Sequence, residues 1–253
     1  MPTTDKNGQP TIRISAARKS LLAIYGQAAA CLYGALSISE FTELFNHYED
    51  ERTNEQEAVL ALQRYLKAHP YETEYSLYGE YITGPNLMPD EFEDDIESLE
   101  ILRAEQKGKP RFLPEKDEFL KFTRADYFEP TRPYEEFKNY VLKNKLNENE
   151  GLDGVDGDIL DLLEMIQERV EINEIIRHFA GNRYKFNSIE EINAFLKVVM
   201  NVWNNTRAYE LNGHTPDEMM NIEKDNRSTE PALQFPRKIG RNDSYPCGSG
   251  NCR

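Results

Sequence analysis

Hydrophobic residues recur every three or four positions along most of the chain, which is the spacing of amphipathic α-helices. The first such segment covers residues 15–34, and its apolar face continues to residue 36. The positions on this face are Leu21, Tyr25, Ala28, Leu32 and Leu36. Cys31 lies at the flank of the face, where a cysteine is typically a small buried thiol. The pattern therefore predicts a strong first helix.

Two further helices are predicted to follow. In segment 37–48, SISEFTELFNHY, Ser37 and Glu40 have the spacing of a capping box, in which a hydroxyl and a carboxylate satisfy free N–H groups reciprocally. The next apolar periodicity begins after Thr53, and Gln56 stands in the same relation to it. We therefore expect a third helix that starts at Thr53.

The periodicity then changes to short aromatic segments. YSLYGEYI, residues 75–82, predicts a β-strand, and RFLP, residues 111–114, predicts a second one. Between them, residues 89–108 form an acidic helical pattern that ends at Gly108. Three helices, a strand, a helix and a second strand approximate the order of a winged helix, so a winged-helix-like N-terminal domain is one hypothesis.

The second half of the chain is predicted to be helical at 133–146, 158–180 and 188–205. NENEGLDGVDGD, residues 147–158, has five acidic residues, three glycines and no basic residue, which is typical of a hinge. The predicted fold class is mainly α, with helical domains and a small two-stranded β element in the N-terminal half. The expected organisation is a flexible N-terminus at 1–13, an N-terminal helical domain with short strands at 14–146, the acidic hinge at 147–158, a C-terminal helical region at 159–224, and a linker with a tail at 225–253.

Charge and composition narrow the range of partners. With 30 basic and 45 acidic residues the net charge is −15, which disfavours binding to nucleic acid because the phosphate backbone is also negative. The sequence contains no apolar run long enough for a membrane span and no signal-peptide pattern at its N-terminus. Three cysteines do not make a disulfide framework. We expect a cytoplasmic protein with no membrane partner.

The last residues, GRNDSYPCGSGNCR at 240–253, carry a chemical signature. The order of Asn-Asp and then Pro-Cys-Gly-Ser-Gly resembles the SEC-C motif, a small zinc-binding knuckle at the end of the bacterial translocation ATPase SecA and of many unrelated bacterial proteins. The resemblance implies a bacterial protein whose tail makes an accessory protein contact, because SecA uses its own tail to meet a chaperone and the ribosome.

The tail departs from the SEC-C pattern at its metal ligands. Tyr245 stands where the motif has its first cysteine, the basic spacer is missing, and Cys252 alone represents the closing pair. Structural zinc takes four Cys or His ligands, whereas Cys247 and Cys252 supply two. Two interpretations remain open: a degenerate motif without a stable metal, or a zinc site completed by His214 or by a second chain.

A second motif, NNTRAYELNGHTPDEM, covers residues 204–219. Its Asn-Asn-Thr-Arg and Gly-His-Thr-Pro elements resemble sequences that precede SEC-C tails in bacterial proteins. Gly213 can adopt a positive φ that closes the preceding helix, and Thr215 with Glu218 fits a capping box for the next one. The candidate interaction residues are Asn204, Asn205, Arg207 and His214. They either line a polar pocket or satisfy the carbonyl groups of a helix–turn–helix joint.

No motif for catalysis is present in the sequence. It has no phosphate-binding loop, no HExxH and no GxSxG, and the acids of DGVDGD do not have the spacing of an EF-hand. The favoured hypothesis is therefore a non-enzymatic adaptor that binds another protein.

Two other hypotheses are kept. A winged-helix regulator would read nucleic acid with the third helix, whose acids Glu55 and Glu57 accompany Arg64 and Lys67. An enzyme would work through a pocket near His214. An exposed aromatic groove lined by Tyr75, Tyr78 and Tyr81 would favour the protein-binding hypothesis.

Overall fold

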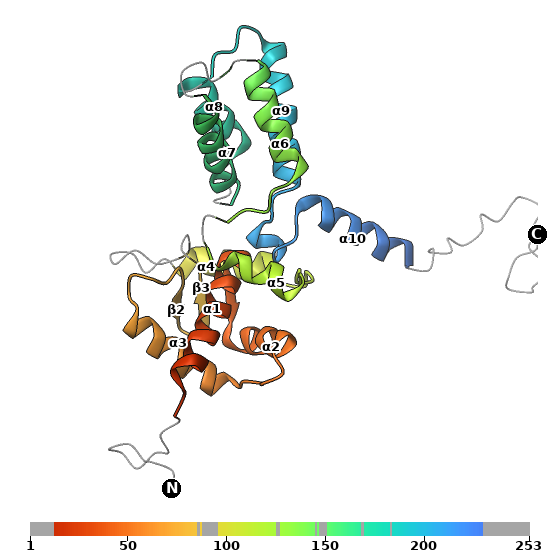
Figure 1. Cartoon of the computed structure of the whole chain (residues 1–253). Helices are drawn as coiled ribbons and strands as arrows, with labels where there is room; N and C mark the ends of the chain where they lie inside the picture. Colours follow the sequence, from red (N-terminus) through yellow and green to blue (C-terminus); the bar gives the residue numbers. More distant parts are fainter. Residues whose placement is uncertain are drawn as a thin grey trace, which may run out of the picture. The chain divides into compact units, whose positions relative to one another are not determined.

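The computed structural model describes residues 13–84, 87, 96–124, 127–144, 146, 151–167, 170–182 and 184–229. Over these residues the chain is mainly α-helical and has one small antiparallel sheet, which confirms the predicted fold class (Figure 1). Its compact units are residues 1–219 and 220–253. In the described ranges no helix combines the length and apolarity that a membrane span requires.

The N-terminal region alternates helices with short strands. Its elements are α1 (Ala16–Tyr33), β1 (Ala35–Ser37), α2 (Ile38–Tyr48), α3 (Glu55–Ala68), β2 (Ser76–Tyr78), β3 (Tyr81–Thr83), α4 (Ile96–Gln106), α5 (Lys116–Phe119) and the 3₁₀ helix η2 (Leu120–Thr123). The sheet has the order β1-β3-β2, and both pairs are antiparallel. Three helices with one strand after the first and a hairpin after the third have the connectivity of a winged helix.

Side-chain caps explain where the first helices begin. The predicted capping box of α2 is confirmed, because the Glu40 N–H donates to Ser37 Oγ and the Ser37 N–H donates to Glu40 Oε2. The predicted N-cap of α3, Thr53, is wrong by one residue. Asn54 is the N-cap and accepts from the Glu57 N–H, while the Thr53 hydroxyl donates to the Glu57 carboxylate at 2.8 Å.

The β element differs from its prediction in three ways. Segment 75–82 is a hairpin rather than one strand, because Gly79, with φ of 56°, reverses the chain between β2 and β3. RFLP, at 111–114, is a loop, and its Phe112 N–H donates to the Asn212 carbonyl at 3.0 Å. The strand β1 was not predicted, because three residues between two helices are too short to show a period of two.

Helix α1 forms the centre of the first hydrophobic core. Tyr25, Ala28 and Leu32 are buried on it, as the periodicity predicts, whereas the predicted Leu21 is only partly buried and its neighbour Leu22 is fully buried. Cys31 is also buried, and burial, with the nearby charge of Glu74, raises the pKa of its thiol to about 12. The thiol is therefore protonated at neutral pH and packs as a small apolar group.

Four helices of the second half form a bundle with its own core. They are α6 (Arg132–Lys143), α7 (Gly151–Gln167), α8 (Ile172–Asn182) and α9 (Ile189–Asn204), and α6 packs against both α7 and α9 (Figure 1). The large buried side chains at the centre are Phe137, Phe179 and Phe195. Ser188 is the N-cap of α9, and its Oγ accepts from the N–H of Glu191 at 3.2 Å.

The segment 147–158, predicted to be a hinge, is helical from Gly151 onward. Glycine weakens a helix by about 1 kcal/mol relative to alanine, but burial of one face outweighs a local preference of this size. Val155 and Asp158 are buried, and Asp158 accepts a hydrogen bond of 2.7 Å from the Tyr184 hydroxyl. The single helix predicted over 158–180 is also wrong, since α7 ends at Gln167 and α8 starts at Ile172.

Candidate functional site

The motif at 204–219 forms a tight turn between two helices. After α9 the chain makes a short 3₁₀ helix, η3 (Tyr209–Leu211), and then enters α10 (Pro216–Thr229). Asn212 and Gly213 have φ of 52° and 80°, the left-handed conformation expected of Gly213. The Glu218 N–H donates to Thr215 Oγ1 at 3.2 Å, and the Thr215 N–H donates to Glu218 Oε2 at 3.1 Å. The predicted capping box is therefore confirmed.

Arg207 is the centre of this turn. Only 12% of its side chain is exposed. Its Nη1 donates to the Gly213 carbonyl and to Glu218 Oε2, both at 3.0 Å, and its Nε donates to Glu129 Oε2. The guanidinium carbon lies 3.5 Å from the centroid of the Phe112 ring. One side chain thus links the loop at 111–114, the segment before α6 and the start of α10.

His214 meets Arg207 on the same carboxylate. Its Nδ1 lies 3.3 Å from Glu218 Oε2, and its ring packs edge-on against Phe112. Its Nε2 is enclosed and has no hydrogen-bond partner within the described part of the chain. A ring nitrogen that solvent does not reach cannot meet a substrate in this arrangement, so the geometry is that of a structural joint.

The two predicted asparagines lie beside this joint. Asn205 Nδ2 donates to the Asn201 carbonyl at 3.0 Å and to Asp217 Oδ2 at 3.4 Å. Asn204 is the last residue of α9 and is partly exposed. The structure therefore brings Arg207 and His214 together on one carboxylate, and it gives Asn205 a separate contact to α10.

The zinc prediction falls outside the described residues, because Cys247 and Cys252 both lie beyond residue 229. Within the described ranges, no three His, Cys, Asp or Glu side chains are grouped as a metal ion would need.

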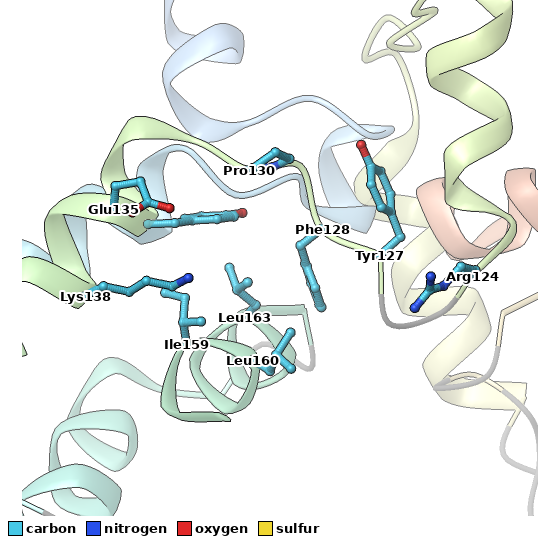
Figure 2. Close-up of a pocket in the computed structure, with 10 residues that line it drawn as sticks. Arg124, Tyr127, Phe128, Pro130, Glu135, Lys138, Ile159, Leu160 and Leu163 are labelled. Atoms are coloured by element: carbon cyan, nitrogen blue, oxygen red, sulfur yellow. The ribbon is translucent and has the colours of Figure 1, made fainter. Parts of the chain in front are cut away.

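A pocket of about 230 Å³ lies against α6 and α7, and we name it the apolar pocket. Phe128 and three residues of α7, Ile159, Leu160 and Leu163, form its apolar lining, and Figure 2 shows the α7 side chains directed toward Phe128. Arg124, Glu135 and Lys138 supply polar groups around it. The Leu160 side chain is 42% exposed.

A second pocket, of about 410 Å³, is polar. We name it the cationic pocket, because Arg103, Lys107, Lys109 and Arg111 line it together with one carboxylate, Glu40. Burial alone would raise the pKa of Glu40. The backbone N–H of Ser37 and the guanidinium groups of Arg103 and Arg111 outweigh this and lower that pKa to about 2.

Sequence reasoning missed both pockets. Each one is lined by segments that are far apart in the chain, and neither carries a motif. An exposed aromatic groove of Tyr75, Tyr78 and Tyr81, which would have favoured the protein-binding hypothesis, is not formed. Tyr75 is 1% exposed, and Tyr78 and Tyr81 are partly buried against the cluster that contains Leu99 and Leu102.

Comparisons with protein-family models, with curated proteins and with solved structures gave no match to this chain, so the candidate sites rest on their own geometry.

Proposed function

We propose that this chain is a non-enzymatic interaction protein that binds another protein through the apolar pocket. The observation that carries the proposal is an apolar lining within a polar rim, the arrangement in which protein interfaces place their anchor residues. Leu160 is the exposed edge of this lining. A partner's bulky side chain inserted beside it would remove apolar surface from water on both molecules.

The charge around the pocket indicates the chemistry of the partner. Lys138 of the rim forms an ion pair with Asp156 at 2.6 Å, so its charge is already compensated. The rim also carries one further base, Arg124, and one exposed acid, Glu135, while the whole chain carries −15. We therefore expect a basic segment that presents an aromatic or long aliphatic anchor, because complementary charge speeds association and selects partners.

The test is affinity purification from the cells that express the protein, using wild type and two matched variants. Leu160→Asp places a charge in the apolar pocket. Leu142→Asp is the control, because Leu142 is 40% exposed on α6 and does not line the pocket. We expect a partner that is retained by wild type and by Leu142→Asp and lost with Leu160→Asp. Equal retention by both variants would contradict the proposal.

The winged-helix connectivity favours nucleic-acid binding as a second candidate function. In that arrangement α3 would face the major groove, and its exposed positions include Glu55, Gln56, Gln63 and Lys67. The charges of Glu55 and Lys67 cancel, so this set offers little attraction to phosphates. Nucleic-acid binding is therefore the second candidate. Fluorescence anisotropy with a random-sequence duplex at low salt tests it. Binding that Lys67→Glu abolishes would favour it over the first proposal.

We propose that the SEC-C-like tail adds an accessory contact, with zinc held only if other ligands complete the site. Metal content of untagged protein, purified under reducing conditions beside Cys247→Ser, is the measurement. One zinc per chain that the variant loses means that the same chain supplies the missing ligands, and one zinc per two chains means a site shared across a dimer. Protein without zinc contradicts the metal-binding interpretation of the tail.

A further inference from the structure

The cationic pocket has more positive charge than its own carboxylate can balance. Arg103 Nη2 and Arg111 Nη2 both donate to Glu40, at 2.8 and 2.9 Å, so two guanidinium groups share one negative charge. Lys109 Nζ donates to the Glu210 carbonyl, which carries no formal charge, and Lys107 is exposed. Four cationic groups therefore surround a single anion, in a chain whose net charge is −15.

The two arginines are held in place before any ligand arrives. Glu40 fixes both guanidinium groups from one side. Aromatic rings support them as well, since Arg103 lies 5.5 Å from the centroid of Tyr81 and Arg111 lies 5.2 Å from that of Tyr33. A ligand that meets these groups loses little side-chain entropy on binding, which favours affinity.

The loop that closes the pocket exposes its backbone. Gly108 has φ of 80°, and no atom lies within 4 Å of the place where a Cβ would stand. Asn212 holds this loop in position, because its Nδ2 donates to the carbonyls of Gln106 and Lys109 at 3.0 and 2.9 Å. Gly108 therefore leaves open space beside the cationic groups, which a ligand can enter.

We propose that the cationic pocket binds a small molecule with two or more phosphate groups, as a site separate from the apolar pocket. The excess of three positive charges suits a diphosphate or triphosphate better than a single carboxylate. Arginine guanidinium groups match phosphate oxygens geometrically, and lysines add unoriented charge. A volume of about 410 Å³ lies in the range of pockets that hold small ligands.

Isothermal titration calorimetry at low ionic strength tests the proposal on the full chain, with inorganic pyrophosphate, ATP and citrate as probes. The variant Lys107→Gln/Lys109→Gln removes two charges from the pocket. The matched control, Lys67→Gln/Lys197→Gln, removes two exposed lysines on α3 and α9. Circular dichroism of each variant verifies that it is folded.

We expect both phosphate probes to bind wild type and the control with similar affinity. Their affinity for the pocket variant should be at least about tenfold lower. ATP that binds more tightly than pyrophosphate supports a nucleotide, and equal binding supports inorganic or simple phosphorylated ligands. The proposal is overturned if neither phosphate probe binds wild type, if the two double variants lose affinity equally, or if citrate binds as tightly as the phosphates.

Discussion

The N-terminal region, residues 13–124, and the helical bundle, residues 128–206, bury their side chains in different ways. The first region places polar groups within its core. The hydroxyls of Tyr33 and Tyr48 donate to the carbonyls of Phe112 and Pro114, both at 2.7 Å, and thereby hold the loop at 111–114 against the helices.

Arg18 also fixes a loop of the N-terminal region by donating hydrogen bonds to its carbonyl groups. It is 8% exposed, and its Nη1 and Nη2 donate to the carbonyls of Glu51 and Arg52 at 2.9 Å. It also forms an ion pair with Glu57 and lies over the ring of Phe45. The loop between α2 and α3 is therefore fixed by directional contacts.

The bundle relies more on ring packing, although it also buries the Asp158 carboxylate against the Tyr184 hydroxyl. Phe137, Phe179 and Phe195 lie with centroids 5.7 to 6.2 Å apart, and Tyr184 and Phe186 pack against Phe195 as well. Hydrogen bonds specify partners, whereas apolar burial is non-directional. Hydrogen bonds from particular polar atoms fix the loops of the N-terminal region, whereas the bundle is stabilised mainly by the burial of large apolar side chains. The bundle also leaves an apolar pocket at its side.

The largest effect is expected from Phe195→Ala in the bundle. Removing the Phe195 ring, which contacts Phe137, Phe179, Tyr184 and Phe186, leaves a cavity and costs about 3 to 5 kcal/mol of unfolding free energy. Urea unfolding followed by fluorescence of Trp203 measures it, because this single tryptophan packs against the bundle core. Met200→Ala, at an exposed position of the same helix, is the control and should change stability by less than about 0.5 kcal/mol.

Arg18→Met is expected to cost somewhat less, about 2 to 3 kcal/mol, because two carbonyls and the Glu57 carboxylate lose their donor while the apolar stem remains. Urea unfolding monitored by far-UV circular dichroism gives the value. Arg13→Met is the matched control at an exposed position. Equal stability of the two variants would mean that polar contacts do not fix this loop.

Acid is expected to destabilise the N-terminal region more than the bundle. The pKa of Glu40 is lowered from 4.5 to about 2, and hydrogen bonds that outweigh burial lower those of Glu49 and Glu57. Each folded pKa is below the unfolded one, so these groups stabilise the protein above about pH 4.5. That contribution falls as the pH drops toward about 2. All three lie in the N-terminal region.

We therefore expect urea midpoints from circular dichroism to fall more between pH 6 and pH 3.5 than those from Trp203 fluorescence, as expected from linkage. Glu40→Gln should narrow the gap, because it removes the group whose pKa is lowered most clearly. Midpoints from the two probes that fall together would show that the regions respond to acid equally.

The smallest effect is expected at a helix cap. Ser188→Ala removes the oxygen that accepts from the Glu191 N–H and should cost about 1 kcal/mol. Ser188→Thr keeps that oxygen and serves as the control. Trp203 fluorescence during urea unfolding distinguishes them, and an unchanged midpoint for the alanine variant would show that the cap adds no stability to the bundle.

Local patterns predicted what depends on neighbours in sequence. The apolar face of α1, the extent of α9 and the capping boxes of Ser37 and Thr215 follow from spacing alone. The early start of α7 could not be predicted in this way, because its acidic, glycine-rich first half is stabilised by burial against other helices, with Asp158 bonded to the distant Tyr184.

The candidate sites also differ in whether their residues are neighbours in sequence. Arg207 and His214 were identified from a local motif that left a polar pocket and a structural joint as alternatives, and their common partner Glu218 favours the joint. The apolar pocket combines residues near 128 with residues near 160, and only the fold brings them together.

The most direct test of the proposed function is photo-crosslinking from the pocket itself. A benzophenone amino acid replaces Leu160 in one sample and Leu142 in the other, and both are irradiated in cells that express the protein natively. We predict a discrete protein adduct from position 160 that is absent from position 142. No adduct at position 160, or the same adducts from both positions, would contradict a partner bound at the apolar pocket.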